Sequence, residues 1–206
     1  KCDFSITTVY DAERGTVTTD PANIAQLDDI VTVTIEPKTG YVCTAVTVTY
    51  ENGEKSLLLT EVGENRYTFT MPANAVVVTV VFSYDTYTLA KADDCETDGM
   101  ISVNGSVATE TSFEYRFLDP VTITATPKDG YYVASIVAQS ADGSEKFEIT
   151  GAKPAVDTIR GDALTLSFLM PACDLTYTVD YEKCDFSITT VFDAERGTVT
   201  TAPANI

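Results

Sequence analysis

The chain has 206 residues, of which 44% are hydrophobic and 21% are charged, so it can bury the core of one large domain or of two small ones. It carries 13 Lys and Arg against 31 Asp and Glu, and the resulting formal charge of −18 disfavours nucleic acids and anionic membrane surfaces as partners. The chain has no histidine, which removes Ser-His-Asp and Cys-His nucleophile systems and His-ligated zinc; we therefore expect no enzymatic activity.

The first part of the chain shows the period-two alternation that predicts β-strands. Residues 30–35 read IVTVTI, with one apolar face and one hydroxyl face, and they lead into a Pro-Lys-Thr-Gly turn. Asn52-Gly53 is a two-residue hairpin signal between strand-like flanks. A Met-Pro-Ala turn then precedes a final strand predicted over residues 76–82.

The same order of elements returns further along the chain. Asn104-Gly105 separates two short strand-like stretches, and residues 121–125 lead into a second Pro-Lys-x-Gly turn. Asp142-Gly143 is a further hairpin signal, and residues 175–181 are predicted as the last strand. Because no stretch of a dozen residues has helical periodicity, the sequence predicts an all-β fold with little helix.

Self-comparison reveals repetition at two levels. Residues 183–206 repeat residues 1–24 with only two changes, Phe192 for Tyr10 and Ala202 for Asp20. A weaker repeat relates the two Pro-Lys-x-Gly turns and their neighbouring strands. We therefore predict a repeat domain over residues 1–84, a second repeat domain with larger loops over 85–182, and the N-terminal fragment of a third unit, of the first type, over 183–206.

The shared motifs resemble the divergent internalin-type B-repeats of bacterial surface proteins. They are Gly-Thr-Val at 15–17, the Val-Thr strand at 31–33, Pro-x-x-Gly-Tyr at 37–41 and Tyr-x-Phe-x-Met-Pro at 67–72. The second unit departs from this pattern between Gly143 and Thr165, where it is longer. The resemblance implies a domain that is β-grasp-like or a small antiparallel sandwich, repeated in tandem on an extracellular protein that is secreted or attached to the cell surface. It implies no catalytic residues and no cofactor.

Five cysteines accompany the repeats. Cys184 copies Cys2, and the second unit replaces both Cys2 and Cys43 while adding Cys95 and Cys173. Since the members of each pair appear and vanish together, we predict the disulfides Cys2–Cys43 and Cys95–Cys173, each within one domain and suited to an oxidising compartment. The alternatives are buried thiols, or a Cys173–Cys184 bond between successive domains. No Cys-x-x-Cys spacing indicates a zinc site.

Two short motifs are candidate binding sites. Calcium, which prefers oxygen ligands, is the candidate cofactor of an acidic turn made of Asp93, Asp94, Glu96 and Asp98; a solvated turn without a metal is the simpler interpretation. Arg160, Gly161 and Asp162 form the tripeptide that integrins bind, and they lie within the 143–165 insertion. The simpler interpretation is a glycine turn between solvated charges.

The last segment is a candidate for assembly. Phe186 and Ile188 repeat the inward positions of Phe4 and Ile6, so an ordered segment must pack on something. We expect the partners to be neighbouring repeats of the same protein, and head-to-tail self-assembly is the further hypothesis. We expect no membrane insertion, because no apolar run approaches about 18 residues. The predicted function is a structural stalk, spacer or filament subunit. The alternative is an adhesin that binds host protein or glycan through residues 143–165.

Overall fold

The computed structural model describes residues 2–93, 95, 97–191 and 195–200 and divides into two compact units, residues 1–86 and 87–206. The division falls two residues after the predicted boundary, and residues 183–206 are grouped with the second unit. Within the described ranges no helix has the length and hydrophobicity needed to cross a bilayer.

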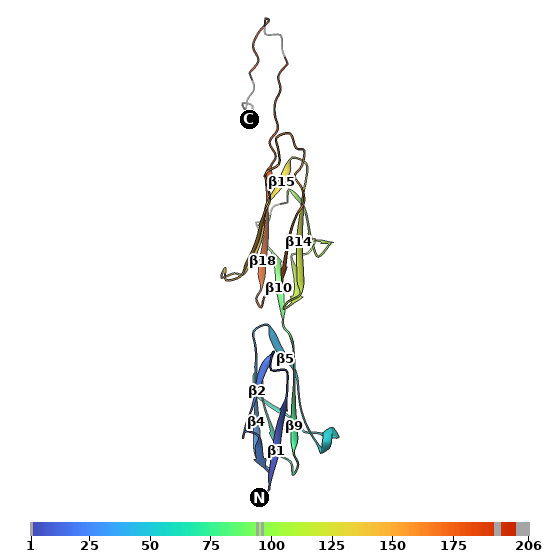
Figure 1. Cartoon of the computed structure of the whole chain (residues 1–206), viewed down its shortest axis with the longest axis vertical. Helices are drawn as coiled ribbons and strands as arrows, with labels where there is room; N and C mark the ends of the chain where they lie inside the picture. The colour runs from blue at the N-terminus through green and yellow to red at the C-terminus, as the bar shows by residue number, and fades with distance from the viewer. Residues whose placement is uncertain (1, 94, 96, 192–194, 201–206) are drawn as a thin grey trace. The chain divides into compact units, whose positions relative to one another are not determined.

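Unit 1 consists of nine strands and one short 3₁₀ turn at Glu51–Gly53 (Figure 1). The strands are β1 (Asp3–Val9), β2 (Gly15–Asp20), β3 (Ile24–Gln26), β4 (Ile30–Pro37), β5 (Tyr41–Tyr50), β6 (Lys55–Ser56), β7 (Thr60–Gly63), β8 (Arg66–Thr70) and β9 (Val76–Tyr84). They form two sheets, with the orders β3-β1-β9-β5-β6 and β2-β4-β8-β7.

The core of unit 1 lies between these two sheets, because alternate residues of each strand point inward. Strand β9 contributes Val76, Val78, Val80 and Phe82, all buried, while the residues between them are more exposed. The facing positions of β4 are also buried; they are Val31, Val33 and Ile35. Each such aliphatic side chain stabilises the fold by about 1.5–3 kcal/mol when it is fully removed from water.

Unit 2 repeats this arrangement. Its strands are β10 (Thr86–Lys91), β11 (Gly99–Val103), β12 (Ser106–Val107), β13 (Ser112–Arg116), β14 (Pro120–Pro127), β15 (Tyr131–Gln139), β16 (Lys146–Thr150), β17 (Leu164–Leu169) and β18 (Leu175–Lys183). The sheets have the orders β13-β10-β18-β15-β16 and β12-β11-β14-β17. The core again joins alternate residues of the last strand, from Leu175 to Tyr181, with those of β14.

The all-β prediction is confirmed, and the core of each unit lies between two sheets. The pairing is not antiparallel throughout, as a small antiparallel sandwich would require, because the first and last strands of each unit are parallel neighbours. Ile6 lies beside Val76 in unit 1, and Leu89 lies beside Leu175 in unit 2. Local alternation cannot reveal this pairing, since the partners are some seventy residues or more apart in the sequence.

The predicted hairpins are present, with loops of different lengths. Asn104 and Gly105 form a two-residue turn, with φ of 48° and 79°, between the paired residues Val103 and Ser106. Around Asp142-Gly143 the loop is longer, because pairing of β15 with β16 ends at Gln139 and Lys146.

The carboxylate of Asp142 holds that longer loop together. It accepts hydrogen bonds from the Oγ of Ser140 at 2.6 Å and from the amide and Oγ of Ser144 at 3.0 and 2.8 Å. Because these donors, Ser140 first, favour the ionised carboxylate, they lower the pKa of Asp142 to about 2.

We expect an NMR titration to place the Asp142 midpoint near pH 2. A lowered pKa means that the stabilisation is fully present above the ordinary aspartate pKa and is lost as the pH falls through about 2. The amide of Ser144 should therefore stay protected from hydrogen exchange in mild acid. Asp142→Asn should weaken that protection at neutral pH. An Asp142 midpoint near 4 would contradict the assignment.

Candidate functional site

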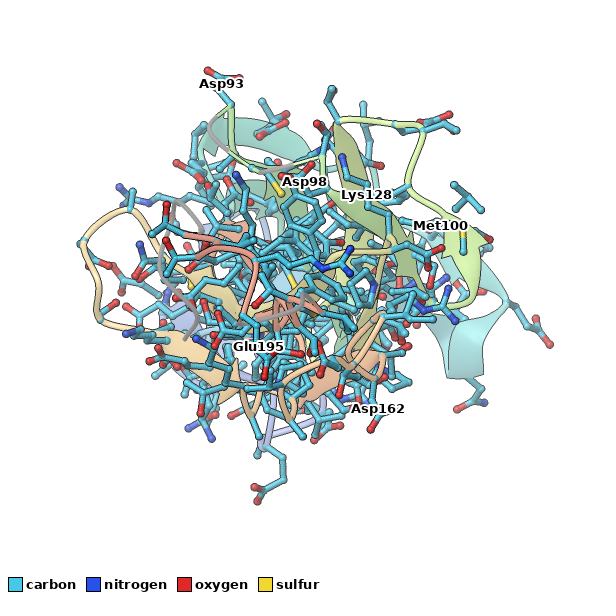
Figure 2. The ribbon with its side chains drawn as sticks, turned by 90° about the horizontal axis from the view of Figure 1, so that it is seen from above. Asp93, Asp98, Met100, Lys128, Asp162 and Glu195 are labelled. Atoms are coloured by element: carbon cyan, nitrogen blue, oxygen red, sulfur yellow. The ribbon has the colours of Figure 1, made fainter. Side chains whose placement is uncertain are left out.

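The acidic turn of unit 2 is closed by a lysine of its own unit. The ammonium group of Lys128 forms an ion pair with Asp98, the Lys128 amide donates to the Asp98 carbonyl at 3.0 Å, and the Tyr131 ring lies beneath the ammonium at 4.9 Å. Figure 2 shows Asp98 beside Lys128, whereas Asp93 projects outward. Asp94 and Glu96 lie outside the described residues, and within the described part no group of three Cys, His, Asp or Glu is arranged to hold a metal. The calcium prediction gains no support.

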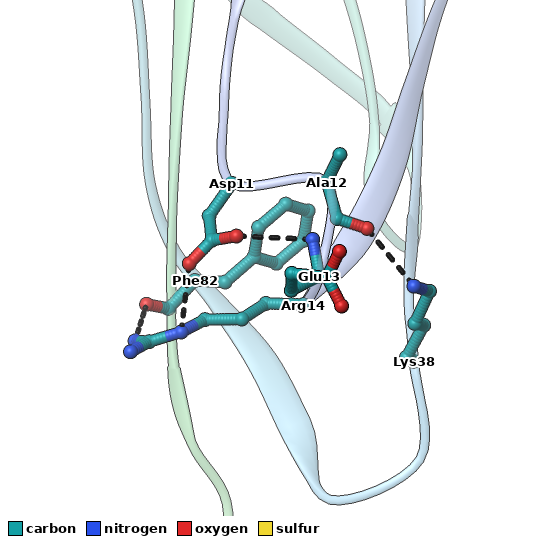
Figure 3. A network of polar contacts seen from close by, with 6 residues as sticks. All are labelled: Asp11, Ala12, Glu13, Arg14, Lys38 and Phe82. Carbon is teal, nitrogen blue, oxygen red and sulfur yellow. Dashed lines mark hydrogen bonds and ion pairs between the residues drawn. The ribbon is translucent and has the colours of Figure 1, made fainter.

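The matching turn of unit 1 is closed in a related way (Figure 3). Arg14 forms an ion pair with Asp11 at 3.0 Å and donates to the Phe82 carbonyl at 3.4 Å. The Lys38 ammonium donates to the Ala12 carbonyl at 2.9 Å. Because Lys38 and Lys128 occupy the same position of the Pro-Lys-x-Gly-Tyr motif, this repeated motif serves to fasten the turn to the sandwich.

The structure does not bring Cys2 and Cys43 together. Cys2 precedes β1, whose register sets Ile6 beside Val76, whereas Cys43 lies opposite Phe82 near the other end of β9. The two cysteines are therefore separated along β9 by about ten residues, or roughly 33 Å. A disulfide needs Cα atoms within about 7 Å, so the predicted bond is not compatible with this register.

The cysteines of unit 2 are separated as well. Cys95 lies in the turn after β10, where its amide donates to the Ala92 carbonyl at 3.2 Å, while Cys173 precedes β18. Cys184 follows the opposite end of β18 from Cys173, which excludes the alternative bond between them too. No disulfide joins the five cysteines, all of which the structure describes, and burial raises the pKa of the Cys43 and Cys173 thiols.

The insertion of unit 2 contains the connection between β16 and β17, residues 151–163 (the β16–β17 connection). Its backbone is bonded to the start of β15: the Gly151 amide donates to Ala134, Gly130 donates to Ile159, and Gly161 donates to Tyr131 at 2.7–3.0 Å. A Cβ atom at Gly161 would lie 2.4 Å from that of Tyr132. The side chains of Arg160 and Asp162 are exposed beside this fixed glycine, and integrin binding stays a prediction.

The same connection binds the residues that follow β18. The Asp157 amide donates to the Asp185 carbonyl at 2.9 Å, and the Asp157 carboxylate accepts bonds at 2.7 Å from both the amide and the Oγ of Ser187. Lys153 forms an ion pair with Asp185 at 2.6 Å. The bonds from Ser187 lower the pKa of Asp157. Sequence reasoning missed Lys153 and Asp157, because unit 1 has no counterpart of the insertion from which to compare them.

The predicted assembly positions are open to solvent. Phe186 is 47% exposed and Ile188 is 41% exposed, whereas Ile6, the counterpart of Ile188, is 4% exposed in the core of unit 1. Described residues 184–191 follow β18 without forming a strand, although their copy in unit 1 is β1. The segment therefore presents an apolar strand sequence that lacks, within the described residues, the partners that β1 has.

Comparison with known proteins finds a family model that matches the first unit. Residues 5–86 match the model of the divergent InlB B-repeat domain, which confirms the resemblance drawn from the sequence motifs. No curated protein and no solved structure matches the chain. Domains of this family occur in bacterial surface proteins.

Proposed function

We propose that this chain, whose first unit is a divergent InlB B-repeat domain, is a load-bearing stalk or spacer of an extracellular bacterial repeat protein, with no catalytic role. The single observation that carries the proposal is the parallel pairing of the first and last strands in both units. The repetition of the sequence supports tandem use, since neighbouring contacts determine the properties of such arrays.

Parallel terminal strands give each unit resistance to stretching. Tension enters unit 1 through β1 and leaves through β9, and these strands pair over Ile6–Val9 and Val76–Thr79. Pulling two parallel neighbours from opposite ends slides one along the other, so the hydrogen bonds between them are loaded together and not one at a time. In unit 2 the corresponding pairing joins Leu89–Lys91 with Leu175–Tyr177.

The link between the units is short, so tension passes directly from the last strand of unit 1 to the first strand of unit 2. Strand β9 ends at Tyr84 and β10 begins at Thr86, so one residue separates the last strand of one unit from the first strand of the next. The net charge of −18 is suited to a spacer that stays in solution, because it opposes non-specific association. The adhesin alternative draws its support from the exposed Arg160 and Asp162 side chains.

Single-molecule force spectroscopy on the full chain tests the proposal. We expect two unfolding events, each releasing on the order of 30 nm of chain, with the shorter step from unit 1. Thr7→Pro should lower the unfolding force of unit 1 and leave that of unit 2 unchanged. The reason is that the Ile6 amide donates toward β3, to Asn23, so the next amide, of Thr7, faces β9.

Thr8→Pro is the matched control, because its amide points away from β9 and proline imposes the same backbone restriction there. Equal unfolding forces for the two variants would contradict a load-bearing β1–β9 ladder. That result, together with host-protein or glycan binding by the intact chain, would favour the adhesin.

A further inference from the structure

We propose that the β16–β17 connection of unit 2 is a docking site for the first strand of a following unit of the first type. The occupant is the segment at 185–187, which copies Asp3 to Ser5 of β1. This inference deepens the proposed tandem function and rests on it, because it assigns a specific contact to the joint between a unit of the second type and its successor.

The docking site is held rigidly before the strand arrives. Three backbone hydrogen bonds fix the connection to β15 and to Gly130 just before it. Asp157 has a φ of 67°, a left-handed conformation that aspartate tolerates better than most residues. In this conformation both the amide and the carboxylate of Asp157 face the segment and bind Asp185 and Ser187. Lys153 adds the ion pair with Asp185.

The contact uses backbone groups that the fold of unit 1 does not pair. In unit 1 the Ile6 amide donates to Asn23, on the β3 side. Since backbone groups alternate along a strand, the Asp3 carbonyl and the Ser5 amide point to the opposite side, where pairing with β9 begins only at Ile6. Their copies are the Asp185 carbonyl and the Ser187 amide, which Asp157 binds. A following unit can therefore fold as unit 1 does and keep this contact.

The two unit types differ at the residue that would otherwise cap this amide. In unit 2 the position of Ser5 is taken by Thr88, and its amide donates to the Asp174 carboxylate of the same unit at 2.7 Å. In unit 1 the position of Asp174 is taken by Ala75, which has no acceptor in its side chain. Unit 2 thus caps its own first strand, whereas a first strand of the unit 1 type depends on a carboxylate from outside. Asp157 provides that carboxylate for Ser187.

The two types of unit also differ in the connection that precedes β8 in unit 1 and β17 in unit 2. In unit 1 it forms β7, which pairs with β8 and covers the edge of that sheet. In unit 2 the longer connection runs to the segment after β18, and β17 is an edge strand among the described residues. We infer that the second type of unit carries the docking site and the first type carries the docked strand. This difference accounts for a module of two units, in which the third copies the first.

Hydrogen exchange of the Ser187 amide in the full chain, followed by NMR, tests the inference. Asp157→Gly removes the carboxylate and keeps a residue that adopts positive φ, and we expect it to increase the exchange rate at least about tenfold. Asp157→Asn keeps one acceptor and should retain part of the protection. The matched control is Asp28→Gly, since Asp28 is an exposed aspartate of unit 1 with a φ of 68°.

Two results would overturn the inference: a Ser187 amide that exchanges as fast as an unstructured one in the native chain, or protection that survives Asp157→Gly. The measurement applies no force and no ligand, so it is independent of the test of the stalk. If the Ser187 amide is unprotected but the units resist force as expected, only the docking inference fails. If the amide is protected but the units unfold at low force, only the stalk proposal fails.

Discussion

Gly99→Ala should destabilise unit 2 by about 3 kcal/mol, the cost of forcing an extra methyl group into a filled site whose neighbours cannot move away. A Cβ atom at Gly99 would lie 2.4 Å from the carbonyl oxygen of Thr126 and 2.5 Å from the ring of Tyr181. The Thr126 carbonyl belongs to the ladder between β11 and β14, in which Met100 lies opposite Thr126. Relief of this clash therefore requires the sheet itself to shift.

Gly15→Ala should cost less, although Gly15 occupies the same position in unit 1. The three atoms nearest to the added methyl group would all belong to the Phe82 ring, the closest at 2.4 Å, and a side chain can turn aside more easily than a paired strand. Gly63→Ala is the control for the change in residue type, because its Cβ would meet only Arg66, at 3.8 Å. We expect this control to stay within about 0.5 kcal/mol of the native chain.

Urea denaturation followed by the NMR signals of each unit separates these effects. Gly99→Ala should shift the transition of unit 2 and leave that of unit 1 in place. A shift no larger than that of Gly63→Ala would contradict the close packing of the final strand over β11.

These glycines show which parts of the fold can be predicted from the sequence and which cannot. Gly15-Thr16-Val17 was recognisable as one of the family motifs, and alternation together with Pro, Gly and Asn indicated most strands and hairpins. The reason for the glycines was not visible, because the aromatic rings over them come from the last strand of each unit. The parallel pairing of Ile6 with Val76 was hidden for the same reason.

Pairing between strands that are far apart in the sequence also determines where the cysteines and the docking site lie. The co-occurrence of Cys2 and Cys43 suggested a bond, yet the pairing of β1, β9 and β5 sets them at different ends of a sheet. Comparison of the units pairs Asp174 with Ala75, a difference that acquires a meaning only when the Thr88 amide is seen to need that carboxylate. The sequence singles out Phe186 and Ile188 because they copy Phe4 and Ile6, and their role in assembly stays a prediction; Asp157 has no copy that could single it out.

Deleting residues 1–24 should cause the chain to form head-to-tail oligomers. The deletion removes β1 and β2, including the buried Ile6 and Val17, and leaves the β9 and β4 edges of unit 1 unpaired. Residues 183–206 of a second molecule carry the same sequence apart from two positions, so they can replace the missing strands. Because the donor lies at one end of the chain and the acceptor at the other, the contact is heterologous and grows without closing.

The two substituted positions do not oppose this exchange. Phe192 keeps the ring of Tyr10, which packs against the core of unit 1, and Ala202 replaces Asp20, which is exposed. Size-exclusion chromatography with light scattering should show masses that rise with concentration, and a peptide of residues 1–24 should shorten the oligomers by filling the acceptor. A chain of residues 25–182 lacks both donors and should stay monomeric with unit 1 unfolded. A chain of residues 25–206 that also stays monomeric at high concentration would exclude strand exchange. In that chain the donor segment, 183–206, and the acceptor edges of unit 1 are both present and have no other partner.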